Sequence, residues 1–365
     1  MRELATIQKI KELNAIPNAD KIEVATVLGW ECVVKKGEFK VGDLVVYIEI
    51  DSIVPSNNPY FEFLKDRKYR VRTIKLRGQV SQGLVCPLSI LPNGKSQYVR
   101  EGDNVTDILK ITKYDPQAQQ EISEQEIKKN IWPRFLFKLL MRYKWFRKLQ
   151  SKKKSLWPSF LIKTDEERLQ KIPGVLTKML EQKIPIYITE KLDGQSGTYY
   201  WNKKKFGVCS RNLELKKRNN SSYWQIADKY CMKEELQKFA KVLGIKNIAI
   251  QGEIIGPSIQ GNKYKLKDYA FYIYNIFDID KRKYIPPMYF HGKINVTCLP
   301  MVPLLDVIKM SDEKDVHWWV NYSKGCSNLN ENIKREGIVV RENNISCKPI
   351  SFKVINPEFL LEHGE

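Results

Sequence analysis

Residues 187–194 of the chain read Tyr-Ile-Thr-Glu-Lys-Leu-Asp-Gly, and this octapeptide carries the most specific chemical signal in the sequence. Its first half has the β-branched and aromatic residues typical of a strand, and its Asp-Gly end is typical of a turn. A strand-end lysine can act as a nucleophile if its surroundings favour the neutral amine. The motif Lys-x-Asp-Gly is nevertheless short, and by itself it more often marks the end of an ordinary strand. The rest of the sequence must decide between the two interpretations.

Several further elements follow the octapeptide in a fixed order, each at the edge of a predicted strand. They are Ser210-Arg211-Asn212, Gly252-Glu253, Phe277-Asp278-Ile279, Glu336-Gly337 and Phe352-Lys353. Taken singly, the charged residues would be ordinary surface charges and the phenylalanine an ordinary core residue. The complete ordered set has only a small chance of arising by accident. It therefore predicts one functional site assembled from residues of about 160–360.

Residues 1–111 are predicted to form a small β-barrel domain. Short β-branched runs, such as those at 21–28 and 43–50, are separated by turn segments such as Pro-Asn-Ala-Asp at 17–20. Several short strands at close spacing are typical of small barrels. Residues 16–48 also resemble OB-type barrels, including those that bind tRNA ends in synthetase-associated proteins. Two interpretations stay open, a purely structural barrel and one that contacts nucleic acid.

Residues 112–157 are predicted to be a basic, partly helical linker. Nine lysines and arginines and no acidic residue occur between positions 131 and 154. Phe135, Leu139 and Phe146 recur at helical spacing, which predicts a basic helix with an apolar face. Three interpretations remain for this helix. It docks on the protein with its charges in solvent, it grips RNA phosphates, or it touches a membrane surface.

The ordered motifs resemble those of the covalent nucleotidyltransferases, a superfamily of DNA ligases, RNA ligases and mRNA capping enzymes. The resemblance covers residues from about 160 to 360, and it implies that Lys191 is the nucleophile that accepts a nucleotide. Two local runs strengthen it, Lys-Thr-Asp-Glu-Glu-Arg at 163–168 and Gln-Gly-Glu-Ile-Ile-Gly-Pro at 251–257. For residues 158–365 the resemblance implies a nucleotidyltransferase domain with ATP-grasp-like antiparallel sheets.

The order of the predicted domains separates the branches of this superfamily. DNA ligases and capping enzymes carry an OB domain after the last lysine motif, whereas here the chain ends at Glu365, shortly after Lys353. A barrel-like region instead comes first. This order is similar to RNA ligase family 5, the type whose OB domain precedes the catalytic domain. We therefore expect an α+β protein that consists of an OB-like β-barrel, a basic linker and a nucleotidyltransferase domain.

The resemblance also assigns nucleotide-binding roles to the motif residues. Glu190 would read the adenine edge, Phe277 would stack on the adenine ring, and Arg211 would grip the ribose and the RNA end. Lys353 would neutralise the α-phosphate of ATP. Planar guanidinium groups suit such bidentate contacts, and aromatic faces suit stacking.

Three carboxylates are expected to hold the metal and to take part in nucleotide binding. These are Asp193, Glu253 and Glu336, which would bind Mg²⁺ or Mn²⁺ directly or through its water molecules. The amine of Lys191 must lose its proton to attack phosphorus, and the reference pKa of lysine is about 10.4. A nearby cation lowers that pKa by repulsion, and Lys353 and the bound metal are the candidates.

The last motif departs from the pattern of many relatives, which have two lysines flanking one residue. Here the run is Ser351-Phe352-Lys353, so a serine replaces the first lysine. A similar run occurs in family 5, so we interpret it as a subfamily trait. The substitution leaves open which group contacts the β- and γ-phosphates, with Lys348 as a poorly placed candidate.

The composition agrees with a nucleic-acid partner. The formal net charge is +20 and the pI is about 9.4, which favours binding to polyanions. Seven scattered cysteines without a Cys-x-x-Cys pair indicate a reducing compartment, and neither a signal peptide nor a long apolar run occurs. We expect a monomer that is cytoplasmic or otherwise intracellular, without stable membrane association.

The sequence thus predicts an ATP-dependent RNA ligase that joins 3′-hydroxyl and 5′-phosphate ends through a lysyl-AMP intermediate, in RNA repair. Its RNA partner would have nicked or broken ends, with or without a bridging strand. Two alternatives use the same fold. One is a DNA ligase or capping-type enzyme with a different acceptor, and the other is a non-catalytic RNA-binding protein. The intact set of motif residues disfavours the second alternative.

Overall fold

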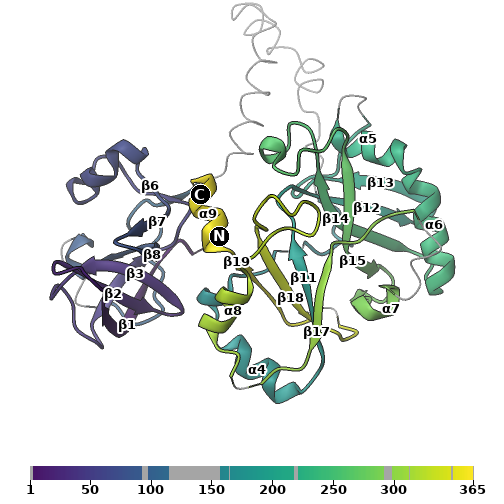
Figure 1. Cartoon of the computed structure of the whole chain (residues 1–365). Helices are drawn as coiled ribbons and strands as arrows, with labels where there is room; N and C mark the ends of the chain where they lie inside the picture. Colours follow the sequence, from purple (N-terminus) through teal and green to yellow (C-terminus); the bar gives the residue numbers. More distant parts are fainter. Residues whose placement is uncertain are drawn as a thin grey trace, which may run out of the picture. The chain divides into compact units, whose positions relative to one another are not determined.

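Figure 1 shows the computed structural model of the chain, which divides into two compact units, residues 1–154 and 155–364. It describes residues 3–92, 98–114, 157–163, 165–217, 221–291, 298–311, 313–346 and 348–364. The predicted basic helix at 131–154 and Cys347 lie outside these residues. No helix among the described residues is both long and apolar enough to cross a membrane.

The N-terminal unit is built on a five-stranded antiparallel sheet in the order β3-β2-β1-β4-β9. Its strands are β1 (Ala5–Ala15), β2 (Ile22–Val27), β3 (Trp30–Lys35), β4 (Leu44–Ile48) and β9 (Leu84–Cys86). Strand β1 pairs with β4 through its first half and with β2 through its second half, with a bulge at Ile10/Glu12. A bulge bends and twists a strand. Strand β1 therefore belongs to both sides of a strongly curled sheet.

Shorter elements complete the barrel. They are the hairpin β7 (Thr73–Leu76) and β8 (Gln79–Gln82), the sheet β10 (Thr112–Lys113), β5 (Ser52–Ile53) and β6 (Arg70–Val71), and the 3₁₀-helices η1 (Pro59–Arg67) and η2 (Leu88–Ile90). The edge of β3 lies against β8, where Val33 N donates to Ser81 Oγ (2.9 Å). Inside, Trp30 and Tyr47 pack in an apolar core. This nearly closed barrel confirms the predicted OB-like fold.

The C-terminal unit contains two antiparallel sheets. One has the order β17-β11-β18-β19, with β17 (Leu304–Ile308), β11 (Ile186–Lys191), β18 (Gly337–Glu342) and β19 (Ser351–Ile355). The other has the order β13-β12-β14-β15-β16, with β13 (Lys205–Cys209), β12 (Gln195–Asn202), β14 (Ile248–Ile255), β15 (Ala270–Asp278) and β16 (Lys283–Tyr284). The predicted α+β class with antiparallel sheets is confirmed.

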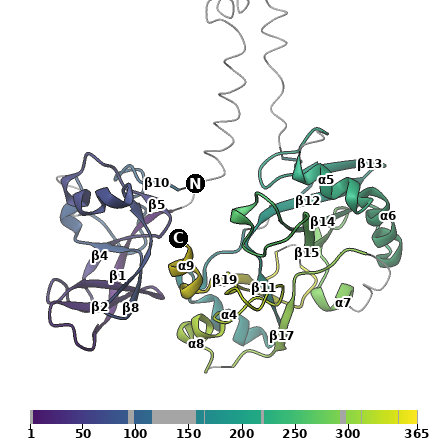
Figure 2. The same ribbon diagram turned by 45° about the horizontal axis from the view of Figure 1, so that its top comes forward.

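Helices cover one face of each sheet. In the β17-containing sheet, Ile186 and Ile338 pack in one cluster with Met179 and Trp319, which lie on α4 (Val175–Gln182) and α8 (Val316–Tyr322). The β13-containing sheet is covered by α5 (Ser222–Lys229) and α6 (Met232–Leu243), as Figures 1 and 2 show. The remaining elements are η3 (Leu169–Lys171), η4 (Gln260–Asn262), α7 (Pro287–His291) and α9 (Pro357–His363).

The other faces of the two sheets look toward each other. The guanidinium carbon of Arg341, on β18, lies 5.6 Å from the ring centroid of Tyr274, on β15. Side chains alternate across a strand. The residues of β11, β18 and β19 that do not face α4 and α8 therefore point toward β14 and β15. This arrangement places Lys191 and Lys353 on the inner side of the domain.

Candidate active site

Lys191 is the last residue of β11, and its ammonium contacts a carboxylate from the neighbouring strand. Lys191 pairs in register with Gly337, the first residue of β18, so Glu336 comes directly before that strand. Lys191 Nζ lies 2.5 Å from Glu336 Oε2. The pairing of β11 with β18 therefore joins two predicted site residues that are separated by 145 positions in the sequence.

Gly337 shows why this junction requires a glycine. Its φ is +157°, and a Cβ placed on it would lie 2.1 Å from the backbone oxygen of Val354 on β19. Backbone oxygens cannot move aside as flexible side chains do. The close approach of β19 thus fixes the start of β18, and with it the direction in which Glu336 leaves the sheet.

The Asp-Gly turn after Lys191 leads the chain from one sheet to the other. A Cβ on Gly194 would lie 2.4 Å from the backbone oxygen of Ile254, so only glycine lets this turn pass so close to β14. Asp193 then lies next to β14, which carries Glu253. Its carboxylate pairs with Lys263 (2.5 Å), and its backbone N–H donates to the hydroxyl of Tyr264 (2.9 Å).

Glu253 completes the group of predicted acidic residues. Burial raises the pKa of its carboxyl to about 8 against the opposing effect of Lys191, and Glu336 and Asp193 add to the rise. These mutual effects mean that Lys191 and the three acids lie within electrostatic reach of each other. The structure therefore brings together all four residues predicted for the metal site and the nucleophile.

The same carboxylates act on the pKa of the nucleophile. Burial by itself would lower the pKa of Lys191, but Glu336 and Glu253 outweigh burial and raise it. Lys191 in turn contributes to lowering the pKa of Lys353, so the two ammonium groups are close enough to interact. In this arrangement Lys191 is a protonated partner of Glu336. The neutral amine requires that the charge on the carboxylates be offset.

Lys353 and Arg211 are joined by an acid that the sequence analysis gave no role. Asp165 accepts from Arg211 Nη2 (2.9 Å) and from Lys353 Nζ (3.4 Å). Burial lowers the pKa of Lys353 to about 8, although Asp165 opposes this shift. Lys353, predicted to neutralise the α-phosphate, and Arg211, predicted to grip the ribose and the RNA end, therefore converge on one carboxylate, as they would on an anionic ligand.

The run at 163–168 owes its position to a buried ion pair. Burial would raise the pKa of Glu166, but Arg341 outweighs burial and lowers it, and the two groups lie 2.6 Å apart. The backbone of the run also accepts from β19, where Lys353 N donates to the oxygen of Glu167 (2.9 Å). This run was recognised in the sequence as a motif, but its contacts come from the folded chain.

The side chain of Glu190 is buried, and one of its two carboxylate oxygens is an acceptor not engaged by the backbone. Its side chain is only 1% exposed, and Oε2 accepts from the backbone N–H of Asn328 (2.8 Å). The other oxygen, Oε1, is buried and makes no hydrogen bond of normal geometry, although the Ser327 hydroxyl is close enough to oppose the rise in the pKa of this carboxyl. Burial raises the pKa of this carboxyl. A buried acceptor without a donor is costly unless a ligand supplies one, so this atom fits the predicted contact with an amino group.

Phe277 does not join the group, in contrast to the prediction that it stacks on adenine. It is 1% exposed and packs in a core cluster with Leu161 and Tyr284, so protein covers its ring. Tyr272 lies five residues earlier on β15 and pairs in register with Glu253. It is half-buried, and burial raises its pKa with a further contribution from Glu190. Tyr272 is thus the aromatic residue of β15 that shares a face with Glu253, and no sequence motif marks it because several aromatic residues occur along this strand.

The carboxylates fit a hard metal ion only in part. Their oxygen atoms are the donors that Mg²⁺ and Mn²⁺ prefer. Within the described ranges, however, no three His, Cys, Asp or Glu side chains are arranged to hold a metal ion by themselves. Two of the acids instead bind lysines, Glu336 with Lys191 and Asp193 with Lys263. Lys348, the candidate for the outer phosphates, is exposed in the loop between β18 and β19.

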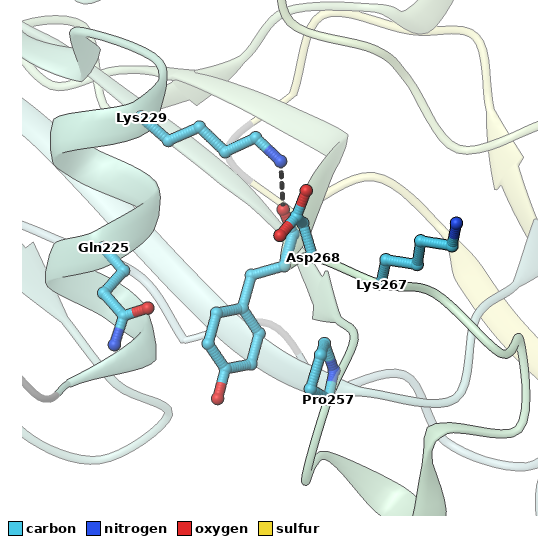
Figure 3. A pocket seen from close by; sticks show the side chains of 6 residues that line it. Gln225, Lys229, Pro257, Lys267 and Asp268 are labelled. Atoms are coloured by element: carbon cyan, nitrogen blue, oxygen red, sulfur yellow. Dashed lines mark hydrogen bonds between the residues drawn. The ribbon is translucent and has the colours of Figure 1, made fainter.

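A pocket of about 430 Å³ lies at the end of β14, outside this group. It is lined by Gln225, Lys229, Pro257, Lys267, Asp268 and Tyr269. Lys229 Nζ donates to the backbone oxygen of Tyr269 (2.7 Å), and Figure 3 shows Lys229 with Gln225, Pro257, Lys267 and Asp268 around the pocket. Two lysines, an amide and an aromatic ring are groups that suit a nucleotide better than an apolar ligand.

A strand-end lysine among acids, set between two antiparallel sheets, defines the class of lysyl-nucleotidyltransferases. Comparisons with known proteins narrow this class. An OB-fold domain model matches residues 4–88, and the RNA ligase model matches residues 184–355. A search of curated proteins finds no match.

Solved structures match along the whole chain. Naegleria gruberi RNA ligase with PPi is 35% identical with a TM-score of 0.79, and the match covers 100% of this chain and 99% of that one. A variant of that ligase with ATP and Mn is 34% identical with a TM-score of 0.80 and covers 100% of both chains. Another variant, with AMP and Mn, is 34% identical with a TM-score of 0.78 and covers 98% of both. The chain belongs to the RNA ligase family.

Proposed function

We propose that this protein is an ATP-dependent RNA ligase that joins 3′-hydroxyl and 5′-phosphate ends through lysyl-AMP on Lys191. One observation carries the proposal. In a chain that belongs to the RNA ligase family, the amine at the end of β11 contacts Glu336 and lies within electrostatic reach of Glu253 and Asp193. The solved relatives support the cofactors, since structures of Naegleria gruberi RNA ligase hold ATP, AMP and Mn.

The chemistry consists of three phosphoryl or nucleotidyl transfers. Lys191 Nζ, once deprotonated, attacks the α-phosphorus of ATP. A nitrogen–phosphorus bond forms while the bond to the bridging oxygen breaks, and pyrophosphate leaves with the electron pair. A 5′-phosphate oxygen of RNA next takes the AMP and releases the amine. A 3′-hydroxyl finally attacks that phosphate, its proton passes to solvent, and AMP leaves.

Glu253, Glu336 and Asp193 would hold the divalent cation, directly or through water. Bound there, Mg²⁺ or Mn²⁺ supplies positive charge that neutralises the phosphates. Burial is the main cause of the raised pKa of Glu253, and Glu336 and Asp193 add to it, which agrees with three acids gathered in one buried region. A cation bound to these carboxylates would also offset the negative charge that raises the pKa of Lys191, so the amine could lose its proton more readily.

The nucleotide base would lie between Glu190 and Tyr272. Glu190 Oε1, buried and without a donor, would accept a hydrogen bond from the amino group of adenine. Tyr272 replaces Phe277 as the stacking ring in this proposal, because the Phe277 ring is covered by the protein core. Guanine carries an oxygen at the corresponding position, so this contact favours ATP over GTP.

The phosphates would be met by Lys353 and Arg211. Both cations converge on Asp165 in this structure, at 3.4 Å and 2.9 Å. Asp165 is 54% exposed, so an incoming phosphate can take its place at little cost. Charge-assisted contacts of this kind align the reacting groups and stabilise the charge that develops in the transition state.

The RNA would be held outside the nucleotide site. We propose that the barrel at 1–111 and the basic linker at 112–157 grip the strand with the 3′-hydroxyl end, as basic grooves commonly do. The pocket at the end of β14, with Lys267 and Tyr269, is a further contact for the RNA. We also propose that the nucleotidyltransferase domain comprises residues 158–365 and that the protein acts as an intracellular monomer in RNA repair, without stable membrane association.

Intact-protein mass spectrometry tests the covalent step. After incubation with ATP and Mg²⁺ or Mn²⁺, the protein should gain the mass of one AMP, and the Lys191→Ala variant should not. Fragmentation should locate the AMP on Lys191. Failure of the wild-type protein to gain AMP under any metal condition would contradict the proposal.

Sealing assays on nicked duplexes identify the acceptor. Each strand is varied between RNA and DNA, and ATP is compared with GTP as the donor. We expect sealing to require ATP and an RNA 3′-hydroxyl end. Labelling by GTP alone would favour a capping-type enzyme, and sealing of DNA ends alone would favour a DNA ligase. RNA binding without AMP transfer would indicate a non-catalytic protein.

A further inference from the structure

We propose that Lys263 is a positioning residue that neutralises Asp193 in the metal-free enzyme and must leave it when the divalent cation binds. The proposal rests on the proposed function, since it assigns Asp193 to the metal site. Lys263 lies in the loop between β14 and β15, directly after η4. The sequence analysis did not single it out, because it belongs to none of the ordered motifs.

The loop is built to present this lysine in one position. Asn262 closes it internally, since its Nδ2 donates to the oxygen of Leu266 (2.9 Å) and its Oδ1 accepts from the backbone N–H of Leu266 (3.0 Å). Tyr264 is 6% exposed and packs in a cluster with Leu192. The loop is thus anchored to the Lys191–Gly194 turn by a buried ring beside Lys263.

The ammonium of Lys263 is held from two sides. Its Nζ lies 2.5 Å from Asp193 Oδ2, and it lies 4.7 Å from the ring centroid of Phe359 on α9. The lysine side chain is 15% exposed and that of Asp193 is 10% exposed. An ion pair so far removed from water is screened little, and a cation over a ring face gains further attraction. The Lys263–Asp193 ion pair is therefore held in a defined geometry and is not a loose surface contact.

The charges of the group explain why this cation is needed. Asp193, Glu253 and Glu336 bring three carboxyl groups together; Lys191 pairs with Glu336, and Arg211 adds positive charge that acts on Glu253. Lys263 adds positive charge at Asp193, with which Lys191 does not pair. Buried charges without compensation are strongly destabilising. Lys263 thus stands where a metal ion or its water ligands would interact with Asp193.

Two roles make opposite predictions for metal affinity. If Lys263 only supports the fold, its removal loosens Asp193 and weakens metal binding or leaves it unchanged. If Lys263 competes with the cation, its removal leaves Asp193 free for the metal. Binding then becomes tighter, since the free energy of breaking the ion pair no longer opposes it.

A Mn²⁺ titration followed by electron paramagnetic resonance, without ATP or RNA, distinguishes these roles. We expect Lys263→Met to bind Mn²⁺ roughly three- to tenfold more tightly than the wild type, a coupling of ordinary size. Lys265→Met is the matched control, since Lys265 is exposed in the same loop, and should bind as the wild type does. The gain should disappear in the double variant Lys263→Met, Asp193→Asn. Unchanged or weaker binding by Lys263→Met would overturn the proposal.

The wild-type protein provides a second test that does not depend on the variant folding. Lysine acetylation with peptide mapping measures how accessible Lys263 is with and without Mn²⁺. We expect Lys263 to be protected without metal and its modification rate to rise several-fold as Mn²⁺ is added. A rate that stays constant or falls overturns the inference. If the protein gains AMP but the modification rate of Lys263 does not rise, only this inference fails. If the protein never gains AMP, the proposed function itself fails.

Discussion

The barrel and the nucleotidyltransferase unit differ in where their poorly exposed charged side chains lie. The barrel core is apolar, and its well-buried ion pair, Arg70 with Asp51 at 2.8 Å, is covered by the ring of Tyr114. In the second unit, the side chains of Lys191, Lys263, Lys353 and Arg341 are each at most 24% exposed, and all carry a charge into the region between the two sheets.

This difference separates charge that serves the fold from charge that serves chemistry. A buried ion pair rarely stabilises a fold more than apolar packing would, because desolvation offsets the attraction. The Arg70–Asp51 pair is consistent with a structural role. Lys191 and Lys353, with shifted pKa values and like charges close together, indicate a functional site. Substitutions in the two units should therefore damage different properties.

The largest effect is expected from a cation in the site. Lys353→Met should slow AMP transfer by roughly 10²- to 10³-fold, because a preorganised charge at the phosphate is lost. Its effect on thermal stability should be small or favourable, since a buried charge is removed. Single-turnover AMP transfer and thermal unfolding measure the two properties.

The barrel pair Arg70–Asp51 provides the contrasting variant. Arg70→Met should lower the free energy of unfolding by about 1–3 kcal/mol, the usual cost of an unpaired charged hydrogen-bonding group. Its rate of AMP transfer at a temperature where it is folded should match the wild type. The comparison would break down if Arg70→Met lost AMP transfer or if Lys353→Met retained it.

Phe277 and Tyr272, both on β15, allow a test within the second unit of which residue supports the fold and which binds the nucleotide. Phe277→Ala should destabilise the protein by about 3–5 kcal/mol, because it empties a core position. Tyr272→Ala should cost little stability and should raise the ATP concentration for half-maximal AMP transfer by roughly tenfold, through lost stacking. Denaturant unfolding and AMP-transfer titrations measure the two effects. The reverse pattern would restore Phe277 as the adenine ring.

The acid group should also leave a pH signature on stability. The pKa of Glu253 is raised from 4.5 to about 8, so the folded state binds the proton that the unfolded state releases between these values. Its contribution to stability is complete below about pH 4.5 and is lost as the pH rises through about 8. Thermal unfolding in chelator-containing buffer should show this decline between pH 5 and 8. In Glu253→Gln the decline should be smaller, and an identical profile would contradict the assignment.

The smallest effect is expected at the pocket at the end of β14. Tyr269→Ala should reduce sealing of RNA ends by a few-fold, as base stacking contributes about 1–3 kcal/mol at such sites. AMP transfer to Lys191 should be unaffected, because the pocket does not contact the acid group. Lys204→Ala, in the exposed turn between β12 and β13, is the control. Equal sealing by the Tyr269 variant and the control would remove this pocket from the RNA path.

Sequence patterns were sufficient to predict the fold class, and they predicted the nucleophile that the proposed function assigns to Lys191. The alternating β-branched runs of residues 1–111 predicted the OB-like barrel, because a strand with one buried face must alternate. Strand β11 ends at Lys191, as the octapeptide predicted. Ordered motifs also predicted that Asp193, Glu253 and Glu336 share a site, although their individual roles stay proposals.

The differences between the expected and the observed surroundings of site residues come from contacts between distant segments. Phe277 was selected because it begins a recognisable motif, but a β-bulge and the packing of Leu161 and Tyr284 place it in the core. Asp165 lies inside a motif, yet its bridging position depends on β19 and on the end of β13. Such positions depend on register and crossing geometry, which no local pattern encodes.

By itself, the sequence determined which chemical groups are present and in which order, since strand periodicity, turn residues and the lysine motif are local properties. The tertiary structure decided which charges meet. Glycine at 194 and 337 allows backbones to approach closely, and the fold brings Glu336 into contact with Lys191 and Asp193 and Glu253 within electrostatic reach of it. The tertiary structure also pairs Lys263 with Asp193 and leaves Glu190 Oε1 without a hydrogen-bond donor. Distance and burial set electrostatic energies, and both arise only when the chain is folded.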